Sequence, residues 1–397
     1  MTKTEKIFIE LLGAGSLGKE LNEYIKENIT DECLKEVLSL SKRHSVLNVV
    51  TFALLKNAAL RENDKKAYRS QIMMWAVRHE KMAYELKKIS DLFEENEIYH
   101  IPLKGAVLRN YYPEPHLRTS CDIDVYIKEE DLEKAESLLK SELGYSLRVR
   151  DPHDIGFITK NNISFELHFK LIEALNSKGE QKYRWNADCL KDVWDKAVPE
   201  QDKKYCLKMS DEHFYFYHIA HMAKHFEHRG CGARFFVDLW ILNHKLSFDK
   251  EKRDALLKEG KLKDFEREAV LLSEVWFADA EETPVSRKME SFVLRSGTYG
   301  TLDNLVSIQQ SKQKGRIKHI ANEIFLPYQT LKKNYKILEK HKWMYPFCQF
   351  DRWMGLLSSD KREKSTSYKI VKMSAAKSSD ETKVTAELFD KLGLSRK

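Results

Sequence analysis

The stretches Leu103-Lys104-Gly105 and Asp122-Ile123-Asp124-Val125 decide which fold this chain is expected to adopt. The second alternates acidic and apolar residues, which predicts a strand whose two carboxylates point to the same side. Carboxylates this close repel each other unless a cation neutralises them, and such hard oxygen ligands suit Mg²⁺ or Mn²⁺. In the first stretch, a turn with lysine and glycine can bring an ammonium group and the backbone to a phosphate. Together the two stretches predict a metal-dependent phosphoryl or nucleotidyl transfer site.

The segment Ile163–Phe169 supplies a third acid at strand-like spacing. Its apolar residues share one face, so Glu166 and His168 share the other. Glu166 is the expected third carboxylate, because three carboxylates can hold two cations, one at the attacking oxygen and one at a triphosphate. The alternative interpretation is a solvated sheet face for Glu166 and His168, and a pair of surface acids for Asp122 and Asp124.

The order of the expected elements in the middle of the chain indicates the fold class. Strands are expected at 100–103, 122–127, 145–150, 155–159 and 163–169, with helices at 106–111 and 129–143. This β-α-β-α-β-β-β order predicts a small mixed sheet with helices packed on one side. Because helical periodicity dominates before and after it, the predicted class is α+β, a small sheet core flanked by N-terminal and C-terminal helical regions.

The chain divides by composition into regions. We expect an N-terminal helical region at 1–97, the sheet core at 98–175 and a C-terminal helical region at 176–357. The last region, 358–397, is expected to be a flexible tail, because residues 358–382 are rich in lysine and serine with few large apolar residues. Its last amphipathic segment, 384–394, is expected to dock elsewhere on the protein. The aromatic-rich segment 343–353 is interpreted as core packing, with a stacking platform for a base as the alternative.

Composition excludes several classes of protein. The 397 residues are 42% hydrophobic, enough for a core, and the net charge of +7 is scattered along the chain. That charge fits phosphate-bearing substrates; a nucleic-acid partner is possible but not indicated. The six cysteines include no C-x-x-C pair, which excludes zinc ribbons and thioredoxin-type sites. No P-loop, G-x-G-x-x-G or G-x-S-x-G motif is present. Without a secretory signal or an 18-residue apolar run, we expect a cytoplasmic protein with no membrane association.

Basic residues near the acids are candidates for binding phosphate. Lys104, directly before Gly105 at a strand end, can offset the charge of a triphosphate or be an ordinary solvated lysine. Arg118 can clamp a phosphate with its fork or pair with a carboxylate. Arg234 and Asp238 lie four residues apart on an expected helix, so they form a local ion pair or leave Arg234 to reach a phosphate.

A histidine-rich helix is expected at 213–228. Its histidines at positions 218, 221, 225 and 228 share one helical face. Three interpretations stand side by side. His221 and His225 line a cleft opposite the sheet and contact nucleotide or acceptor, the pair chelates a structural metal, or the histidines are partly buried and hydrogen-bonded.

The residues Leu103-Lys104-Gly105, Tyr112-Pro113, Arg118 and Asp122-Ile123-Asp124-Val125 resemble the nucleotidyltransferase superfamily of the DNA polymerase β type. The similarity is to its uncharacterised bacterial branch, described only as nucleotidyltransferase family proteins. The resemblance implies that Asp122 and Asp124 are the paired acids, that Glu166 is the third, and that all three bind Mg²⁺ or Mn²⁺. It also implies an NTP as substrate. Lys104-Gly105 replaces the usual Gly-Gly or Gly-Ser, and Cys121 replaces a glycine common in the branch.

The function that this resemblance implies is metal-dependent transfer of a nucleoside monophosphate from an NTP to an acceptor, with release of pyrophosphate. One alternative is an RNA-directed nucleotidyltransferase or toxin, which needs a continuous basic groove. Another is a catalytically inactive nucleotide-binding module. The sequence specifies neither the acceptor, small molecule or macromolecule, nor the oligomeric state.

Overall fold

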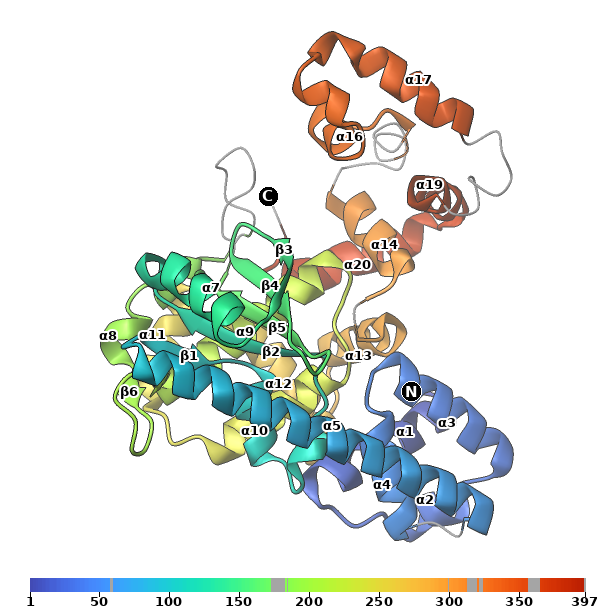
Figure 1. Cartoon of the computed structure of the whole chain (residues 1–397). Helices are drawn as coiled ribbons and strands as arrows, with labels where there is room; N and C mark the ends of the chain where they lie inside the picture. Colours follow the sequence, from blue (N-terminus) through green and yellow to red (C-terminus); the bar gives the residue numbers. More distant parts are fainter. Residues whose placement is uncertain are drawn as a thin grey trace.

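The computed structural model describes residues 1–57, 60–172, 183, 185–298, 300–312, 320, 324–355 and 365–395. It is an α+β fold, as predicted, in which helices surround one mixed sheet (Figure 1). Helices α1 to α4 lie on one side of the molecule, the sheet lies on the other, and the long helix α5 spans both. The predicted division into regions stays a prediction.

The sheet contains five strands in the order β1-β2-β5-β4-β3. The strands are β1 His100–Pro102, β2 Asp122–Ile127, β3 Ser146–Arg150, β4 Asp154–Ile158 and β5 Ser164–His168. The central strands β2 and β5 are parallel, and the other neighbours are antiparallel. Each strand lies within one residue of its predicted bounds, because the period-two alternation of buried side chains marks strands clearly.

One face of this sheet is a dry apolar layer. It packs against α5 (Glu62–Glu95) and α7 (Leu132–Ser141), whose buried residues join the same cluster. The strand residues of the cluster include Ile123, Val125, Phe157, Phe165 and Leu167. Since burying a side chain of this size contributes about 1.5–3 kcal/mol, this layer is a main source of the stability of the sheet.

Helices also cover the other face, so the predicted packing on one side only is wrong. Helix α9 (Asp211–His228) and α10 (Arg234–Lys245) lie across it. Helix α9 buries aromatic residues around most of its circumference, including Phe214, Phe216 and Phe226, so it needs partners on several sides. It therefore packs between the sheet and other helices rather than on the surface.

The N-terminal helices are α1 Lys3–Leu17, α2 Glu23–Glu27, α3 Asp31–Arg43 and α4 Leu47–Asn57. Buried His44, which follows α3, joins them to the C-terminal half of the chain. Its Nε2 lies 3.2 Å from the carbonyl oxygen of Leu294, and the backbone N–H of Ala233 donates to its Nδ1 over 3.1 Å. Both ring nitrogens are satisfied by the neutral imidazole, and burial lowers the pKa of His44 to about 4.

The remaining described elements are mostly helical. The helices are α6 Gly105–Leu108, α8 Val193–Lys196, α11 Lys250–Glu259, α12 Lys263–Phe277, α13 Pro284–Ser296, α14 Leu302–Lys312, α16 Tyr328–Asn334 and α17 Tyr345–Gly355. The 3₁₀ helices are η1 Arg109–Tyr111, η2 Pro115–Leu117, η3 Glu129–Asp131, η4 Ala187–Leu190, η5 Lys336–Glu339 and η6 Lys342–Met344, and strands β6 Val198–Pro199 and β7 Leu207–Lys208 pair separately. No helix among the described residues combines the length and apolarity needed to cross a membrane.

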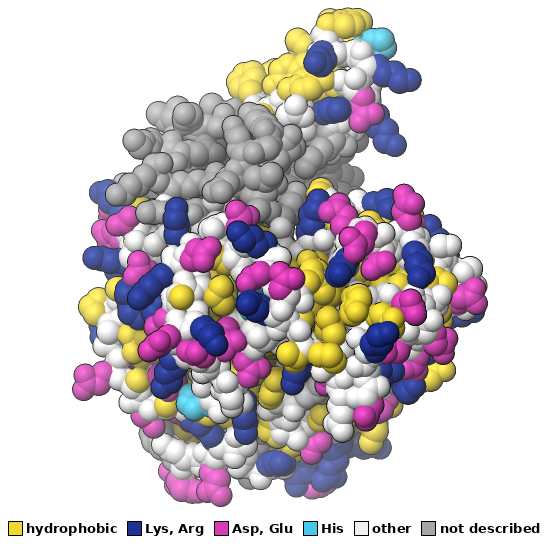
Figure 2. Space-filling view, turned by 90° about the vertical axis from the view of Figure 1, so that its left-hand side faces the viewer, with side chains coloured by type: hydrophobic (Ala, Val, Ile, Leu, Met, Phe, Trp, Pro, Cys, Tyr) yellow, Lys and Arg dark blue, Asp and Glu magenta, His cyan; other side chains and the backbone are white. Residues whose placement is uncertain are grey.

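The aromatic segment around α17 does not pack into the core, so that prediction is wrong. Trp343 is 68% exposed, Phe347 59% and Phe350 60%. Helix α17 buries only its opposite side, where Cys348 joins a small separate cluster with residues from α16 and η5. Hydrophobic side chains therefore gather at the tip of the molecule (Figure 2).

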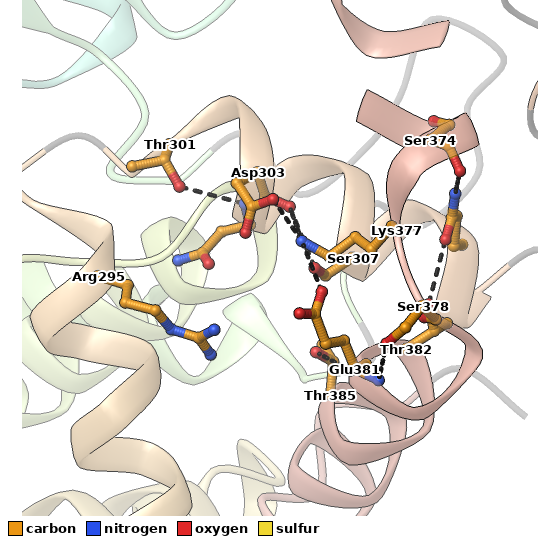
Figure 3. Close-up of polar contacts among 12 residues, drawn as sticks. Arg295, Thr301, Asp303, Ser307, Ser374, Lys377, Ser378, Glu381, Thr382 and Thr385 are labelled. Carbon is orange, nitrogen blue, oxygen red and sulfur yellow. Dashed lines mark hydrogen bonds and ion pairs between the residues drawn. The ribbon is translucent and has the colours of Figure 1, made fainter. Parts of the chain in front are cut away.

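The predicted flexible tail is wrong for residues 365–382, whereas the amphipathic segment 384–394 does dock, with Leu388 and Phe389 in the main hydrophobic core. Residues 365–395 form α19 (Thr366–Ala376) and α20 (Ser379–Lys391), whereas 358–364 lie outside the described residues. Between the two helices, the buried ammonium of Lys377 bonds to Asp303 of α14 and lies 3.6 Å from Glu381 (Figure 3). Ser365 and Ser378 cap the two helices, and apolar residues also hold the segment in place: Leu388, Phe389, Leu392 and Leu394 are buried in the main hydrophobic core.

Candidate active site

The predicted acids lie on the sheet face that points toward α9. In the parallel ladder of β2 and β5, Asp124 lies directly opposite Glu166, and Asp122 lies opposite Ser164. His168 follows Glu166 on the same face, two residues along β5. The three acids and His168 line one pocket, with a cavity volume of ≈ 260 Å³.

Three of these side chains converge more tightly than the rest. Ligand atoms of Asp124, Glu166 and His168 all lie within 4.8 Å of one another. The Nε2 atom of His168 is 2.8 Å from Oδ1 of Asp124 and 3.6 Å from Oε2 of Glu166. Two carboxylates and an imidazole at this spacing fit a divalent cation. Asp122 lines the same pocket outside this closest cluster.

Lys104 points into the acids instead of into solvent. Its Nζ lies 2.7 Å from Oδ1 of Asp124, and its side chain is only 22% exposed. The backbone at Lys104 has φ 46°, a conformation that a residue with a side chain adopts rarely. The turn is therefore held in an unusual shape that aims the ammonium at the carboxylate, which excludes an ordinary solvated lysine.

The charges in this cluster shift one another's pKa values. Burial raises the pKa of Glu166 to about 7, and repulsion from Asp124 adds to the effect. Burial and Asp124 likewise raise the pKa of Asp122. Burial acts on Asp124 too, but the Lys104 ammonium and the hydrogen bond from His168 outweigh it and hold its pKa well below the ordinary value. The cluster carries more negative charge than Lys104 alone balances.

Buried Arg109, which sequence reasoning did not select, fixes the turn after Lys104. Its Nε donates to the carbonyl oxygen of Gly105 over 2.6 Å, and its Nη2 donates to Oγ of Ser120 over 2.7 Å. A Cβ added to Gly105 would lie 3.1 Å from Ser120, so the two segments are in close contact. Arg109 thus ties the turn to the residues that lead into Asp122.

Of the two predictions for Arg118, pairing with a carboxylate is the one that the structure shows. Its Nε and Nη2 donate to the carboxylate of Asp238 on α10, over 2.9 and 2.8 Å. Tyr112 donates to the same carboxylate over 2.8 Å. The predicted local pair of Arg234 with Asp238 is not formed, because Asp238 is buried against Arg118; Nη1 of Arg234 donates to the carbonyl oxygen of Thr119 instead, over 2.8 Å.

Three of the four histidines of the predicted α9 face, His218, His221 and His225, line the pocket, and His228 does not. His221 and His225 line the pocket opposite the acids, with 3.1 Å between their Nε2 atoms. Burial lowers the pKa of both, that of His225 to about 4, so both imidazoles are neutral near pH 7. His218 is buried, with Nε2 3.3 Å from the carbonyl oxygen of Phe235, and His228 is exposed.

Two further residues of the pocket were not predicted. Asp154 begins β4 opposite His168 and is buried, and Tyr217 of α9 has a buried hydroxyl without a partner among the described residues. Asp154 directly precedes the alternating Ile155–Phe157 pattern, so the period-two argument that found Glu166 could have found it. Tyr217 offers no comparable signal, since most of α9 is aromatic.

Comparison with known families agrees with this geometry. A family described as "Uncharacterised nucleotidyltransferase" matches residues 31–278, so the chain belongs to that family. No curated protein matches the chain. Among solved structures, the solution structure of the antibiotic-resistance factor ANT(2'')-Ia is similar, with 11% sequence identity. The match covers 47% of this chain and 94% of that one with a TM-score of 0.34, a level at which we draw nothing from it.

Proposed function

We propose that this chain transfers a nucleoside monophosphate from an NTP to an acceptor and releases pyrophosphate, with Mg²⁺ or Mn²⁺ as cofactor. The observation that carries the proposal is the convergence of buried Asp124 and partly buried Glu166 across β2 and β5, beside the Lys104 turn. Acids this close and this little exposed are costly unless a cation is bound, and family membership supports nucleotidyl transfer as the chemistry of such a site.

In this proposal the acids bind the cation, and the Lys104-Gly105 turn binds the phosphates. Asp122, Asp124 and Glu166 would hold the cation, which when bound would neutralise the phosphates and polarise the reacting phosphorus. Lys104 would reach the outer phosphates, and the backbone at Gly105 would approach them closely. The triphosphate would then lie between the turn and the acids, with its α-phosphate toward the sheet.

Glu166 would also serve the acceptor. It lies opposite Asp124 on the neighbouring strand and faces the same pocket, so its carboxylate can reach both the cation and an acceptor hydroxyl. In the transfer, an acceptor oxygen bonds to the α-phosphorus while the bond from that phosphorus to the β-bridging oxygen breaks. Pyrophosphate leaves with those electrons, and the proton of the acceptor passes to Glu166.

Residues of α9 and α10 that line the pocket opposite the acids would contact the rest of the substrates. His221 and His225 are neutral hydrogen-bonding groups facing the acids, and Arg234 is the nearby cation for phosphate or an acidic acceptor. Arg118 would act by holding the segment before β2 against α10 rather than by touching phosphate, because its fork is bonded to Asp238.

The RNA-directed alternative has less support. Among the coloured residues of the face in Figure 2, Lys and Arg are interspersed with Asp and Glu rather than arranged in a continuous track. A protein that follows a nucleic-acid backbone is expected to carry such a track.

The test is a transfer assay with α-labelled NTPs, Mn²⁺ or Mg²⁺, and a fractionated pool of small metabolites or RNA as acceptor. We expect label on a product and an equal amount of pyrophosphate, both abolished by Asp124→Asn. Metal-dependent NTP binding without product in any pool would favour the inactive module, and product with RNA alone would favour the RNA-directed enzyme.

A further inference from the structure

The histidine in the acid cluster distinguishes this site from one built of carboxylates alone. His168 is buried, with a side chain 4% exposed, and its Nε2 faces both acids. Adjacent ligands of an octahedral ion with bonds of ~2.1 Å lie about 3 Å apart. The separations of 2.8 Å to Asp124 and 3.6 Å to Glu166 bracket that value, so one ion can contact all three.

The second ring nitrogen of His168 is available to carry the proton when Nε2 binds an ion. Nδ1 is buried and has no hydrogen-bond partner among the residues that the structure describes. Metal-binding histidines carry their proton on the nitrogen that faces away from the ion and donate it to a neighbouring carboxylate or carbonyl. Asp154, opposite His168 in the ladder, is the neighbouring carboxylate of the pocket, and its Oδ2 lies 3.0 Å from Nε2 of His153.

We infer that His168 is a direct ligand of the cation, together with Asp124 and Glu166, and that the site selects Mn²⁺ over Mg²⁺. This deepens the proposed function and rests on it, because the same acids hold the ion. Mg²⁺ strongly prefers oxygen ligands and keeps its waters, whereas first-row transition metals accept imidazole nitrogen more readily. One nitrogen in a set of oxygens therefore shifts the preference without excluding Mg²⁺.

Lys104 increases the preference of the site for Mn²⁺ over Mg²⁺. Its ammonium and His168 share the same oxygen of Asp124, so an arriving ion must compete with both. A cation that gains a nitrogen ligand from His168 recovers part of that cost, because the imidazole exchanges its hydrogen bond to Asp124 for a bond to the ion. A cation that cannot use the nitrogen loses that contribution.

The test measures affinity for Mn²⁺ and for Mg²⁺ separately, by calorimetry in the presence of a non-hydrolysable NTP, in the wild type and in His168→Asn. We expect the variant to lose about 10–100-fold in Mn²⁺ affinity, the range seen when groups supporting a metal are removed, and less in Mg²⁺ affinity. His244→Asn, an exposed histidine of α10 outside the pocket, is the matched control, and both affinities should be unchanged in it.

Pulsed electron paramagnetic resonance of Mn²⁺ bound to the wild type gives an independent readout. Coupling to an imidazole nitrogen is expected, and it should disappear in His168→Asn; if that variant does not fold, the wild-type spectrum decides. Bound Mn²⁺ without nitrogen coupling, or equal losses of both affinities in His168→Asn, would overturn this inference alone. Failure of the wild type to bind either metal would overturn the proposed function as well.

Discussion

The two faces of the central sheet are made from alternate residues of the same strands, but one face is apolar and fully buried and the other is charged and partly open to the pocket. Val125 of β2 is fully buried among apolar side chains, and its neighbour Asp124 is 3% exposed among charged ones. Leu167 and Glu166 repeat the contrast on β5. One face stabilises the sheet by removing apolar surface from water, and the other holds charges in a place where they are costly.

The difference shows how a small sheet separates stability from chemistry. Because successive side chains point to opposite sides, the apolar face fixes the backbone positions that the polar face uses. The polar face is then rigid, but its charges are not fully compensated. Lys104 pairs with Asp124, while burial and the neighbouring acids keep the pKa of Glu166 raised. A ligand that brings positive charge to this face should therefore stabilise the fold as it binds.

The largest expected effect is on the polar face, in Asp124→Asn. Without this carboxylate, pyrophosphate release in the transfer assay should fall about 10³-fold or more, or ~4 kcal/mol at 1.36 kcal/mol per tenfold. The free energy of unfolding should also fall by about 3 kcal/mol, because Lys104 loses its buried partner. Asp151→Asn, an exposed acid of the β3–β4 turn, is the control and should change neither. Wild-type turnover in Asp124→Asn would end the metal-site interpretation.

Phe165→Ala tests the apolar face on the same strand as Glu166. Truncating this fully buried ring should lower the free energy of unfolding by about 3–5 kcal/mol, measured by urea denaturation. The folded fraction should keep the metal-dependent nucleotide affinity of the wild type. Loss of that affinity in properly folded protein would show that the two faces are not as separate as we describe.

Lys104→Ala is expected to have two opposite effects. NTP affinity should fall by about 1.5–3 kcal/mol, roughly ten- to 150-fold, because a charge-assisted hydrogen bond to phosphate is lost. Metal affinity without nucleotide should rise, because the competitor for Asp124 is gone. The loss for a nucleoside monophosphate should be smaller. Calorimetry of both nucleotides decides: equal losses would indicate a disturbed turn at Gly105 instead.

The smallest expected effect is that of Asp122→Asn on stability, which should be opposite in sign to that of Asp124→Asn. The pKa of Asp122 is raised, so folding disfavours its charged form and its charge destabilises the fold once it ionises. Asp122→Asn should therefore increase the free energy of unfolding at pH 7 by about 1 kcal/mol or less, which is measured as a slightly higher melting temperature. The gain should vanish below pH ~3.9, where the carboxyl is protonated in both folded and unfolded chains. A loss of stability at pH 7 would contradict the repulsion that we describe.

The strands and the shared face of Asp122, Asp124, Glu166 and His168 were predictable from the sequence. Local alternation determines both, since strand bounds and side-chain direction follow from a period of two. The same argument would have included Asp154, which was overlooked because it precedes the alternating residues rather than lying among them.

The partners of the basic residues could not be predicted in the same way. Arg118 and Asp238 lie 120 residues apart and meet only because α10 packs against the segment before β2. Nothing local distinguishes Asp238 pairing with Arg118 from Asp238 pairing with Arg234. The order of residues 365–382 was missed for a related reason: Lys377 is buried by pairing with distant Asp303, which composition does not reveal. The amphipathic pattern of 384–394, in contrast, was enough to predict that this segment docks.

The most direct test of the central claim is a calorimetric titration of a non-hydrolysable NTP into the wild type, with and without Mn²⁺, repeated with Asp124→Asn. Our account predicts that Mn²⁺ increases NTP affinity at least about tenfold in the wild type, or ~1.4 kcal/mol, and has little effect in the variant. Equal NTP affinity with and without Mn²⁺ in the wild type would contradict it, because the polar face of the sheet would then not be a metal-dependent nucleotide site.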